Sequence, residues 1–154
     1  MERVTTKHLL VFVLLGLFIA VIVSSNGSDC GEFCSVSAET QIQDQAIENV
    51  VVGEAVTLIE DNQQNPNFVI LDVRTPEEFT AGHIEGAINI DFYNEAFKDH
   101  LNSLDKGKKY LIYCRTARRT GEALKIMDDL GFVEVYNMLG GIVQWEAEGL
   151  PTVM

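Results

Sequence analysis

Short apolar runs alternate with amphipathic segments over the last two thirds of the chain. Residues 68–73 form a nearly continuous apolar run rich in β-branched side chains, which is typical of a strand buried on both faces. Residues 121–130 space their apolar side chains for one face of a helix. The pattern predicts strands at 50–52, 68–73, 87–90, 109–113 and 133–139. It predicts helices at 54–62, from 76 onward, at 94–101, at 121–130 and after the glycine pair 140–141.

This alternation of strands and helices predicts an α/β fold with a five-stranded parallel sheet sandwiched by helices. Thr75 is the expected N-cap of one helix, and Pro76 suits its first turn. We expect the folded domain to occupy residues 48–154. Ligands of such sheets bind beyond the carboxyl ends of the strands, which is where Cys114 is expected to lie.

The N-terminus is expected to carry an export signal. Residues 9–23 are apolar without interruption and follow the basic side chains of Arg3 and Lys7. This run suits the core of a signal peptide and is shorter than the roughly 20 residues that a spanning helix needs. We expect residues 1–25 to act as a cleaved signal peptide or as a retained membrane anchor. The basic flank places the domain outside the cytoplasm, so the expected location is extracytoplasmic, either secreted or membrane-anchored.

Residues 26–47 are polar and are expected to form a linker that holds Cys30 and Cys34. In an oxidising compartment these two thiols can pair with each other, which leaves Cys114 as the odd thiol. A redox role for the pair, passing electrons or sulfur to Cys114, is the other possibility.

The formal net charge of -12 argues against nucleic acid or anionic lipid headgroups as partners. Against this acidic background, three of the eleven basic residues fall at positions 115, 118 and 119. The simplest interpretation is a local anion site. No metal or other cofactor is expected, because His83 has no second His or Cys at ligand spacing.

Cys114 lies where the strand at 109–113 ends and a loop leads into a helix. Backbone N–H groups and the positive end of the helix dipole are then expected to face its sulfur. Together with the nearby arginines they favour the thiolate, which is the nucleophilic form of cysteine. The alternative is a buried strand-end cysteine beside surface arginines.

From about residue 49 to its C-terminus, the chain resembles a single rhodanese domain. The match rests on four segments that occur in the family's order. They are residues 72–79 (DVRTPEEF), 82–89 (GHIEGAIN), 113–120 (YCRTARRT), and a last group made of 131–132, 139–142, Trp145 and 149–151. The resemblance implies a five-stranded parallel sheet between helices, which agrees with the fold predicted from the pattern.

The resemblance also implies sulfur transfer through a persulfide on Cys114. The expected donor is a small sulfur compound such as thiosulfate, which loses sulfite, and the acceptor is a thiol or cyanide. The family usually has arginine at the positions of Arg115 and Arg119, so these two are assigned to donor binding. The other expected substrate-binding residues of the loop are Thr116, Ala117, Arg118 and Thr120.

Ala117 departs from the family, whose loop often has glycine at this position. If the position requires a positive φ, alanine costs about 1 kcal/mol there.

The number of residues between Cys114 and Arg119 bears on the class of reaction. Related phosphatases and arsenate reductases carry Cys-x5-Arg, whereas Cys114 and Arg119 form the shorter Cys-x4-Arg. The shorter loop favours a single sulfur atom over a tetrahedral oxyanion. A phosphatase or arsenate reductase, and a non-catalytic binding module, remain the alternative functions.

A charged group at 72–83 resembles a catalytic cluster. We interpret Asp72, Arg74, Glu78 and His83 instead as structural residues that fix loops at one edge of the sheet by hydrogen bonds and ion pairs. Trp145 is expected in the core, and Gly140 with Gly141 in a tight turn.

Overall fold

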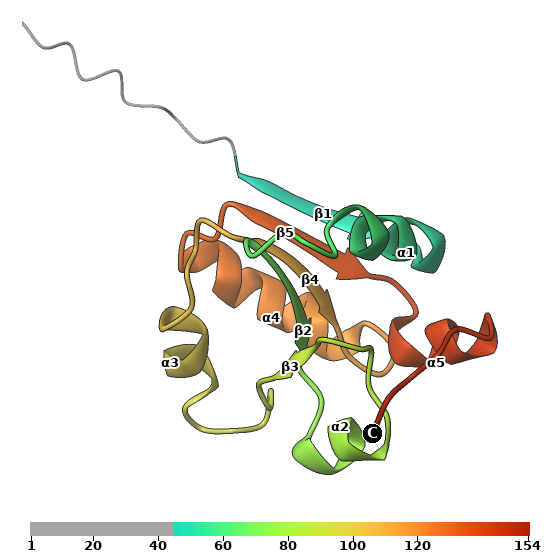
Figure 1. Ribbon diagram of the computed structural model, residues 1–154. Helices are drawn as coiled ribbons and strands as arrows, with labels where there is room; N and C mark the ends of the chain where they lie inside the picture. Colours follow the sequence, from blue (N-terminus) through green and yellow to red (C-terminus); the bar gives the residue numbers. More distant parts are fainter. Residues whose placement is uncertain (1–44) are drawn as a thin grey trace, which may run out of the picture. The chain divides into compact units, whose positions relative to one another are not determined.

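A five-stranded parallel sheet runs through residues 45–154, the part of the chain that the computed structural model describes (Figure 1). Its strand order is β1-β5-β4-β2-β3. The strands are β1 (Ala46–Val50), β2 (Phe68–Asp72), β3 (Ile88–Asn89), β4 (Lys109–Tyr113) and β5 (Glu134–Met138). All neighbouring strands pair in parallel, which confirms the predicted fold class.

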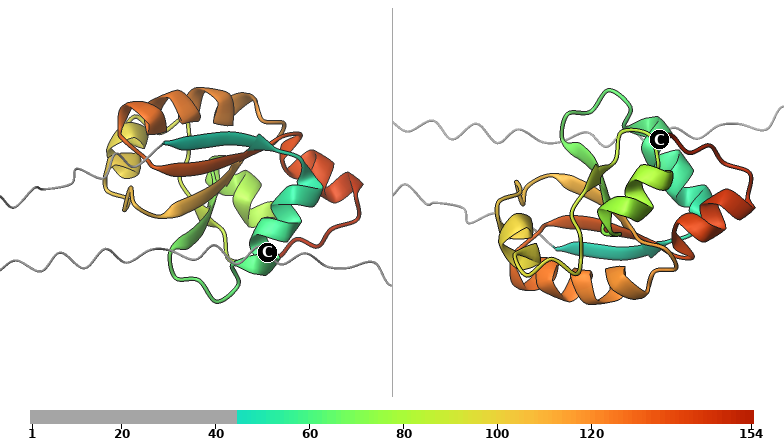
Figure 2. Two further views of the ribbon diagram at one scale, coloured as in Figure 1. Left: turned by 90° about the horizontal axis from the view of Figure 1, so that it is seen from above. Right: turned by 90° about the horizontal axis from the view of Figure 1, so that it is seen from below.

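Helices cover both faces of the sheet. They are α1 (Val52–Asp61), α2 (Pro76–Ala81), α3 (Phe97–Asn102), α4 (Arg118–Asp129) and α5 (Gly141–Ala147). Figure 2 shows α3 and α4 on one side of the sheet and α1 and α5 on the other. Within residues 45–154, no helix is long and apolar enough to cross a membrane. The expected export segment at 1–25, and Cys30 and Cys34, lie outside the described residues.

The central strand β4 contributes to the hydrophobic core on both faces. Tyr110 and Ile112 pack in the core cluster under α3 and α4, and Leu111 and Tyr113 pack in the cluster under α1 and α5. All four side chains are almost completely buried. This alternation follows from the two-residue period of a strand that has helices above and below it. Cys114, the next residue, faces the same side as Tyr110 and Ile112 and packs with them in the cluster under α3 and α4.

The first strand differs from its prediction. β1 occupies Ala46–Val50 rather than 50–52, so the domain begins within the predicted linker, and α1 starts at Val52. β1 is an edge strand that pairs only with β5, and its middle residues Glu48 and Asn49 are exposed. A search for apolar runs misses such a strand, because only Ile47 and Val50 pack against the two core clusters and polar residues lie between them.

The loop before α3 also differs. The predicted helix at 94–101 begins only at Phe97, because two Asx turns precede it. The Asp91 carboxylate accepts the N–H of Tyr93 at 2.9 Å, and the Asn94 side chain accepts the N–H of Ala96 at 2.9 Å. These turns fix the backbone on either side of Tyr93.

Helix α2 begins as predicted. The Thr75 hydroxyl accepts the N–H of Glu78 at 3.4 Å, and the Glu78 carboxylate accepts the N–H of Thr75 at 3.2 Å. Pro76 lies within this reciprocal capping box, in the first turn of the helix. It fixes the backbone position of Glu78.

Candidate active site

A cavity of about 450 Å³ opens at the carboxyl edge of the sheet, where the parallel strand ends meet. Every residue that lines it follows β2, β3, β4 or β5 in the sequence. The lining residues are Glu78, Tyr93, Cys114, Arg115, Thr116, Arg118, Arg119 and Val143. The topology therefore brings together side chains from four separate segments at one site.

Cys114 lies at the bottom of this cavity. Its side chain lines the cavity although the residue is only 1% exposed. It is the one free cysteine among residues 45–154. A sulfur in this position meets solvent only through the cavity, whose lining includes Arg115, Arg118 and Arg119.

Helix α5 holds the Cys114 loop from behind. The N–H of Ile142 donates to the carbonyl of Cys114 at 2.9 Å, and the N–H of Val143 donates to that of Arg115 at 3.2 Å. Gly141 makes this approach possible, because a Cβ there would overlap both carbonyl oxygens. The predicted tight turn at the glycine pair is present, with positive φ at both residues, but the sequence did not reveal its contact with the Cys114 loop.

The bound carbonyls determine where the loop N–H groups point. In a trans peptide the C=O and the following N–H point in opposite directions. Because α5 binds the carbonyls of Cys114 and Arg115, the N–H groups of Arg115 and Thr116 point away from α5. Successive N–H groups turned to one side form the kind of concavity that holds an anion.

Ala117 has the left-handed backbone conformation that the family's glycine suggested. Its φ is 69° and its ψ is 4°, and it is the N-cap of α4. It is the one non-glycine residue with positive φ in the described part of the chain. This conformation costs alanine about 1 kcal/mol relative to glycine.

Arg119 forms a bidentate ion pair with Glu78. Its two terminal nitrogens donate to the two carboxylate oxygens at 2.6 and 2.8 Å. The hydrogen bonds from Arg119 lower the pKa of the Glu78 carboxyl to about 2, and those to Glu78 raise the pKa of Arg119 above its ordinary value. Arg119 is only 8% exposed. An anion in the cavity therefore meets a nearly neutral pair here rather than a free cation.

The other loop residues divide into two groups. Arg115, Thr116 and Arg118 are exposed and line the cavity. Within residues 45–154 neither Arg115 nor Arg118 forms an ion pair. Thr120, predicted to bind substrate, is instead fully buried, and its hydroxyl donates to the Ala117 carbonyl at 3.0 Å.

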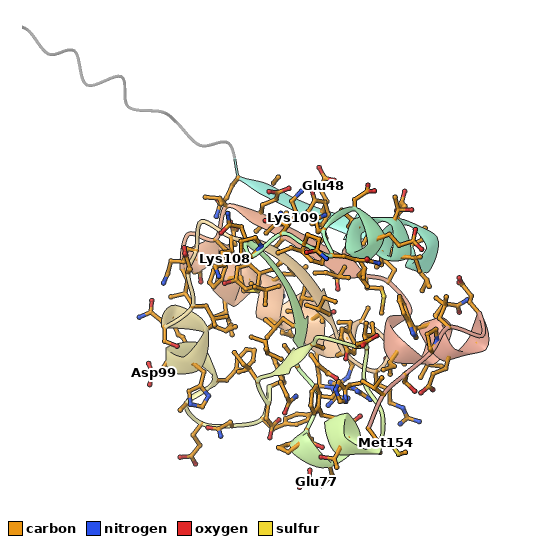
Figure 3. All side chains as sticks on the ribbon, in the orientation of Figure 1. Glu48, Glu77, Asp99, Lys108, Lys109 and Met154 are labelled. Atoms are coloured by element: carbon orange, nitrogen blue, oxygen red, sulfur yellow. The ribbon has the colours of Figure 1, made fainter. Side chains whose placement is uncertain are left out.

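Figure 3 shows acidic side chains such as Glu48, Glu77 and Asp99 spread over the outer surface, with Lys108 and Lys109 at the opposite end of the sheet from α2. Side-chain nitrogen atoms gather between α2 and the sheet in the same view. The lining of the cavity over Cys114 contains three arginines and the carboxylate of Glu78, on a protein whose formal net charge is -12.

Asp72 and Arg74 form a second ion pair that is buried. The terminal nitrogen of Arg74 donates to Asp72 at 2.6 Å and to the Gly82 carbonyl at 2.7 Å. Neither residue lines the cavity over Cys114. These contacts join the end of β2 to the turn after α2.

His83 also lies away from the cavity lining. Its ring stacks on Phe79 at a centroid distance of 3.8 Å, and its Nδ1 lies 3.0 Å from the Phe79 carbonyl. Its backbone pairs with Val153 near the C-terminus. Among residues 45–154, no three His, Cys, Asp or Glu side chains gather in a way that could hold a metal ion.

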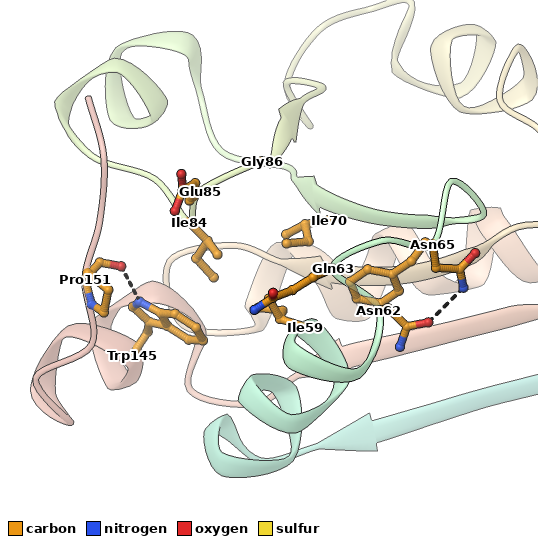
Figure 4. Close-up of a pocket in the computed structure, with 11 residues that line it drawn as sticks. Ile59, Asn62, Gln63, Asn65, Ile70, Ile84, Glu85, Gly86, Trp145 and Pro151 are labelled. Carbon is orange, nitrogen blue, oxygen red and sulfur yellow. Dashed lines mark hydrogen bonds between the residues drawn. The ribbon is translucent and has the colours of Figure 1, made fainter.

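A larger cavity, of about 530 Å³, lies on the α1 and α5 side of the molecule (Figure 4). Gln63 and Ile59 face Trp145 and Ile84 across it, and the Trp145 indole N–H donates to the Pro151 carbonyl at 2.9 Å. Its lining contains apolar side chains, three amides and the single carboxylate of Glu85, but no cysteine or cation. The chemistry of the lining, rather than volume, therefore identifies the smaller cavity as the candidate active site.

Comparisons with known proteins agree with this geometry. A family model described as "Rhodanese-like domain" matches residues 55–148, and the chain belongs to this family. "Thiosulfate sulfurtransferase 16, chloroplastic" of Arabidopsis thaliana is 34% identical over 92 residues, which cover 53% of this chain and 77% of that protein.

Two further comparisons differ in how much of the other protein they cover. "Uncharacterized protein YqhL" of Bacillus subtilis is 37% identical over 76 residues, which cover 49% of this chain and 59% of that relative. The crystal structure of a rhodanese-related protein from Thermoplasma volcanium superposes with a TM-score of 0.55 at 28% identity, over 71% of this chain and 97% of that one.

Two lining residues were not among the sequence predictions. Tyr93 and Val143 come from the loop after β3 and from α5, and both are exposed at the cavity. The sequence signal that could have pointed to Tyr93 is the pair of turn-forming residues around it, Asp91 and Asn94. Their side chains bind the backbone in a fixed turn rather than at the start of a helix.

Proposed function

We propose that the protein is a sulfurtransferase that carries sulfane sulfur as a persulfide on Cys114. The donor is a small anionic sulfur compound of the thiosulfate type, and the acceptor is a thiol, or cyanide in an assay. The observation that carries the proposal is the position of Cys114 at the bottom of a cavity whose rim bears Arg115, Arg118 and the Arg119–Glu78 pair. The family and the name of the Arabidopsis relative support it.

The chemistry takes place in two steps. The Cys114 thiolate attacks the outer sulfur of thiosulfate, and the S–S bond of the donor breaks. Sulfite leaves with that electron pair, and Cys114 holds a persulfide anion. The acceptor nucleophile then attacks the outer sulfur of the persulfide, takes it and restores the thiolate. The loop N–H groups stabilise the negative charge in both states.

The proposal includes the location. The apolar run at 9–23 behind a basic flank supports export, so the domain acts outside the cytoplasm, tethered to the membrane or released. The membrane is then a partner only of the N-terminal segment.

A transfer assay tests the proposed reaction. The full chain is incubated with thiosulfate and cyanide, and thiocyanate is measured for the wild type, for Cys114→Ser and for the double variant Cys30→Ser/Cys34→Ser. We expect activity in the wild type and the double variant and background rates in Cys114→Ser. Transfer that survives in Cys114→Ser, or that is lost in the double variant, contradicts a persulfide on Cys114 alone. Turnover of an aryl phosphate or arsenate in place of thiosulfate contradicts the reaction class.

A further inference from the structure

Tyr93 extends over the cavity from a well-anchored loop. The residue is 57% exposed, yet its N–H is bound by Asp91, and the N–H of Asn94 donates to the Asp91 carbonyl at 3.1 Å. The neighbouring Phe92 packs edge-on against Phe97 in the core, with 5.2 Å between ring centroids. The backbone is thus held on both sides while the phenol remains at the cavity.

The phenol contacts both arginines at the N-terminus of α4. Arg118 donates a hydrogen bond to the Tyr93 hydroxyl oxygen at 3.1 Å. The guanidinium of Arg119 lies 5.6 Å from the centre of the Tyr93 ring, within the range of a cation–π contact. Tyr93 therefore orients the two cations that follow Ala117, although it comes from a different strand connection.

The hydrogen-bonding capacity of this group is only partly used. A tyrosine hydroxyl has one proton to donate, and the oxygen of Tyr93 already accepts from Arg118, so the O–H is available to a ligand. The charge of Arg119 is balanced by Glu78, whereas Arg115 and Arg118 form no ion pair among the described residues. The donors at the cavity that no carboxylate balances are thus Arg115, Arg118 and the hydroxyls of Thr116 and Tyr93.

We infer that Tyr93 is a specificity-determining residue, whose hydroxyl donates a hydrogen bond to a sulfonate oxygen of the donor while Arg118 binds the same group. This inference rests on the proposed function and deepens it, because it makes the preferred substrates small donors in which the transferable sulfur is attached to a sulfonate, S–SO₃⁻. Sulfane donors without such oxygens, for example polysulfide, gain nothing from the hydroxyl. The hydrogen bond is made to the part of the donor that leaves as sulfite.

The test compares two donors in Tyr93→Phe, which removes the hydroxyl and keeps the ring over Arg119. Persulfide formation on Cys114 is followed against the concentration of thiosulfate and, separately, of polysulfide. A lost hydrogen bond to a charged group is expected to raise the half-saturating thiosulfate concentration about tenfold. The polysulfide reaction is expected to change much less than the thiosulfate reaction, because polysulfide has no sulfonate oxygen to accept this hydrogen bond. Tyr136→Phe is the matched control, because its hydroxyl donates to Glu134 and does not line the cavity.

A binding measurement separates this inference from the proposed reaction. Calorimetric titration of thiosulfate into Cys114→Ser and into Cys114→Ser/Tyr93→Phe is expected to give about tenfold weaker binding in the double variant. This result supports the role of Tyr93 even if the wild type transfers no sulfur, which would contradict only the proposed function. Equal thiosulfate constants with and without the hydroxyl overturn the inference. An equal loss for thiosulfate and polysulfide also overturns it, because it indicates a purely structural role.

Discussion

Two arginine–carboxylate pairs occupy the same edge of the sheet, with the same shortest nitrogen–oxygen distance of 2.6 Å, and they differ in their surroundings. The Asp72–Arg74 side chains are 0% and 6% exposed, and Arg74 also donates to the Gly82 carbonyl. In the other pair, Arg119 is 8% exposed but Glu78 is 31% exposed and faces the cavity over Cys114. One pair belongs to the interior and the other to the site.

The two pairs show that an arginine–carboxylate ion pair can have two different roles. The interior pair connects residues two apart in sequence and fixes the end of β2. The cavity pair connects residues 41 apart and joins the start of α2 to the start of α4. It also balances the charge of Arg119, a buried arginine in the lining of the cavity over Cys114. Similar geometry therefore stabilises a loop in one case and adjusts the electrostatics of the candidate active site in the other.

The largest expected effect comes from breaking the interior pair. Asp72→Asn leaves the buried Arg74 cation without its counter-charge, which is expected to destabilise the fold by about 3–5 kcal/mol. Urea unfolding of the full chain measures this loss. The double variant Asp72→Asn/Arg74→Met removes the unpaired charge and is expected to recover part of the stability. A loss below about 1 kcal/mol in Asp72→Asn would mean that water reaches Arg74 freely.

Breaking the cavity pair is expected to cost less. Glu78→Gln keeps the shape of the side chain but not its charge, and solvent in the cavity screens the remaining Arg119 cation. The expected loss is about 1–2 kcal/mol in the same unfolding measurement, between the values for exposed and buried pairs. Glu122→Gln is the control, because its ion pair with Lys125 is exposed at both ends and should change stability by less than about 0.5 kcal/mol. A loss in Glu78→Gln equal to that in Asp72→Asn would erase the distinction between the two pairs.

Acid titration isolates the carboxylate of the cavity pair. The pKa of Glu78 is about 2 in the fold, compared with its ordinary value of 4.5, so between these pH values the unfolded chain binds the proton and the native chain does not. The stabilisation by Glu78 is therefore complete above pH 4.5 and is lost as the pH falls toward 2. In Glu78→Gln, unfolding free energy should depend less steeply on pH in this window. Parallel curves for the two proteins would show that Glu78 is not the group that titrates.

Donor binding gives a third contrast between the pairs. Removing the negative charge of Glu78 leaves Arg119 unbalanced beside the cavity, so the half-saturating thiosulfate concentration in Glu78→Gln should fall about threefold. Asp72→Asn, assayed below its unfolding temperature, should leave that concentration unchanged. Steady-state transfer to cyanide at low ionic strength measures both. Unchanged half-saturation in Glu78→Gln would contradict the charge-balancing role of this residue.

The smallest expected effect concerns strain at the N-terminus of α4. Ala117→Gly places at φ 69° the residue that adopts this conformation without penalty, and the variant should be more stable by about 0.5–1 kcal/mol. Thermal unfolding measures the gain. Gly86→Ala is the converse control, since alanine at its φ of 78° should lose a similar amount. A destabilised Ala117→Gly would indicate that the loop needs the alanine methyl group for packing.

Local patterns accounted for much of the fold and for the nucleophile. The uniformly apolar core of β4 and the Thr75–Pro76 helix start depend on neighbours in sequence, and the structure reproduces both. Cys114 could be placed at a strand end for the same reason. The bounds of the edge strand β1 could not be predicted in this way, because its stabilisation comes from pairing with a strand almost ninety residues away, as the Asn49–Asn137 contact shows.

The finer features of the site depend on long-range contacts that no local pattern encodes. Glu78 was identified as structural, but its partner Arg119 lies 41 residues further along the chain. Tyr93 reaches the site only because the loop after β3 folds back over the end of β4. The glycine at position 141 indicated a tight turn in the sequence. It did not indicate that this turn would pack closely against the carbonyl groups of Cys114 and Arg115.

The most direct test of the central claim is the intact mass of the protein before and after thiosulfate. The wild type is expected to gain the mass of one sulfur atom and to lose it again when cyanide is added. Cys114→Ser, treated in the same way, is expected to gain nothing. A wild type that gains no sulfur, or a Cys114→Ser variant that gains it equally, would contradict the assignment of Cys114 as the sulfur carrier.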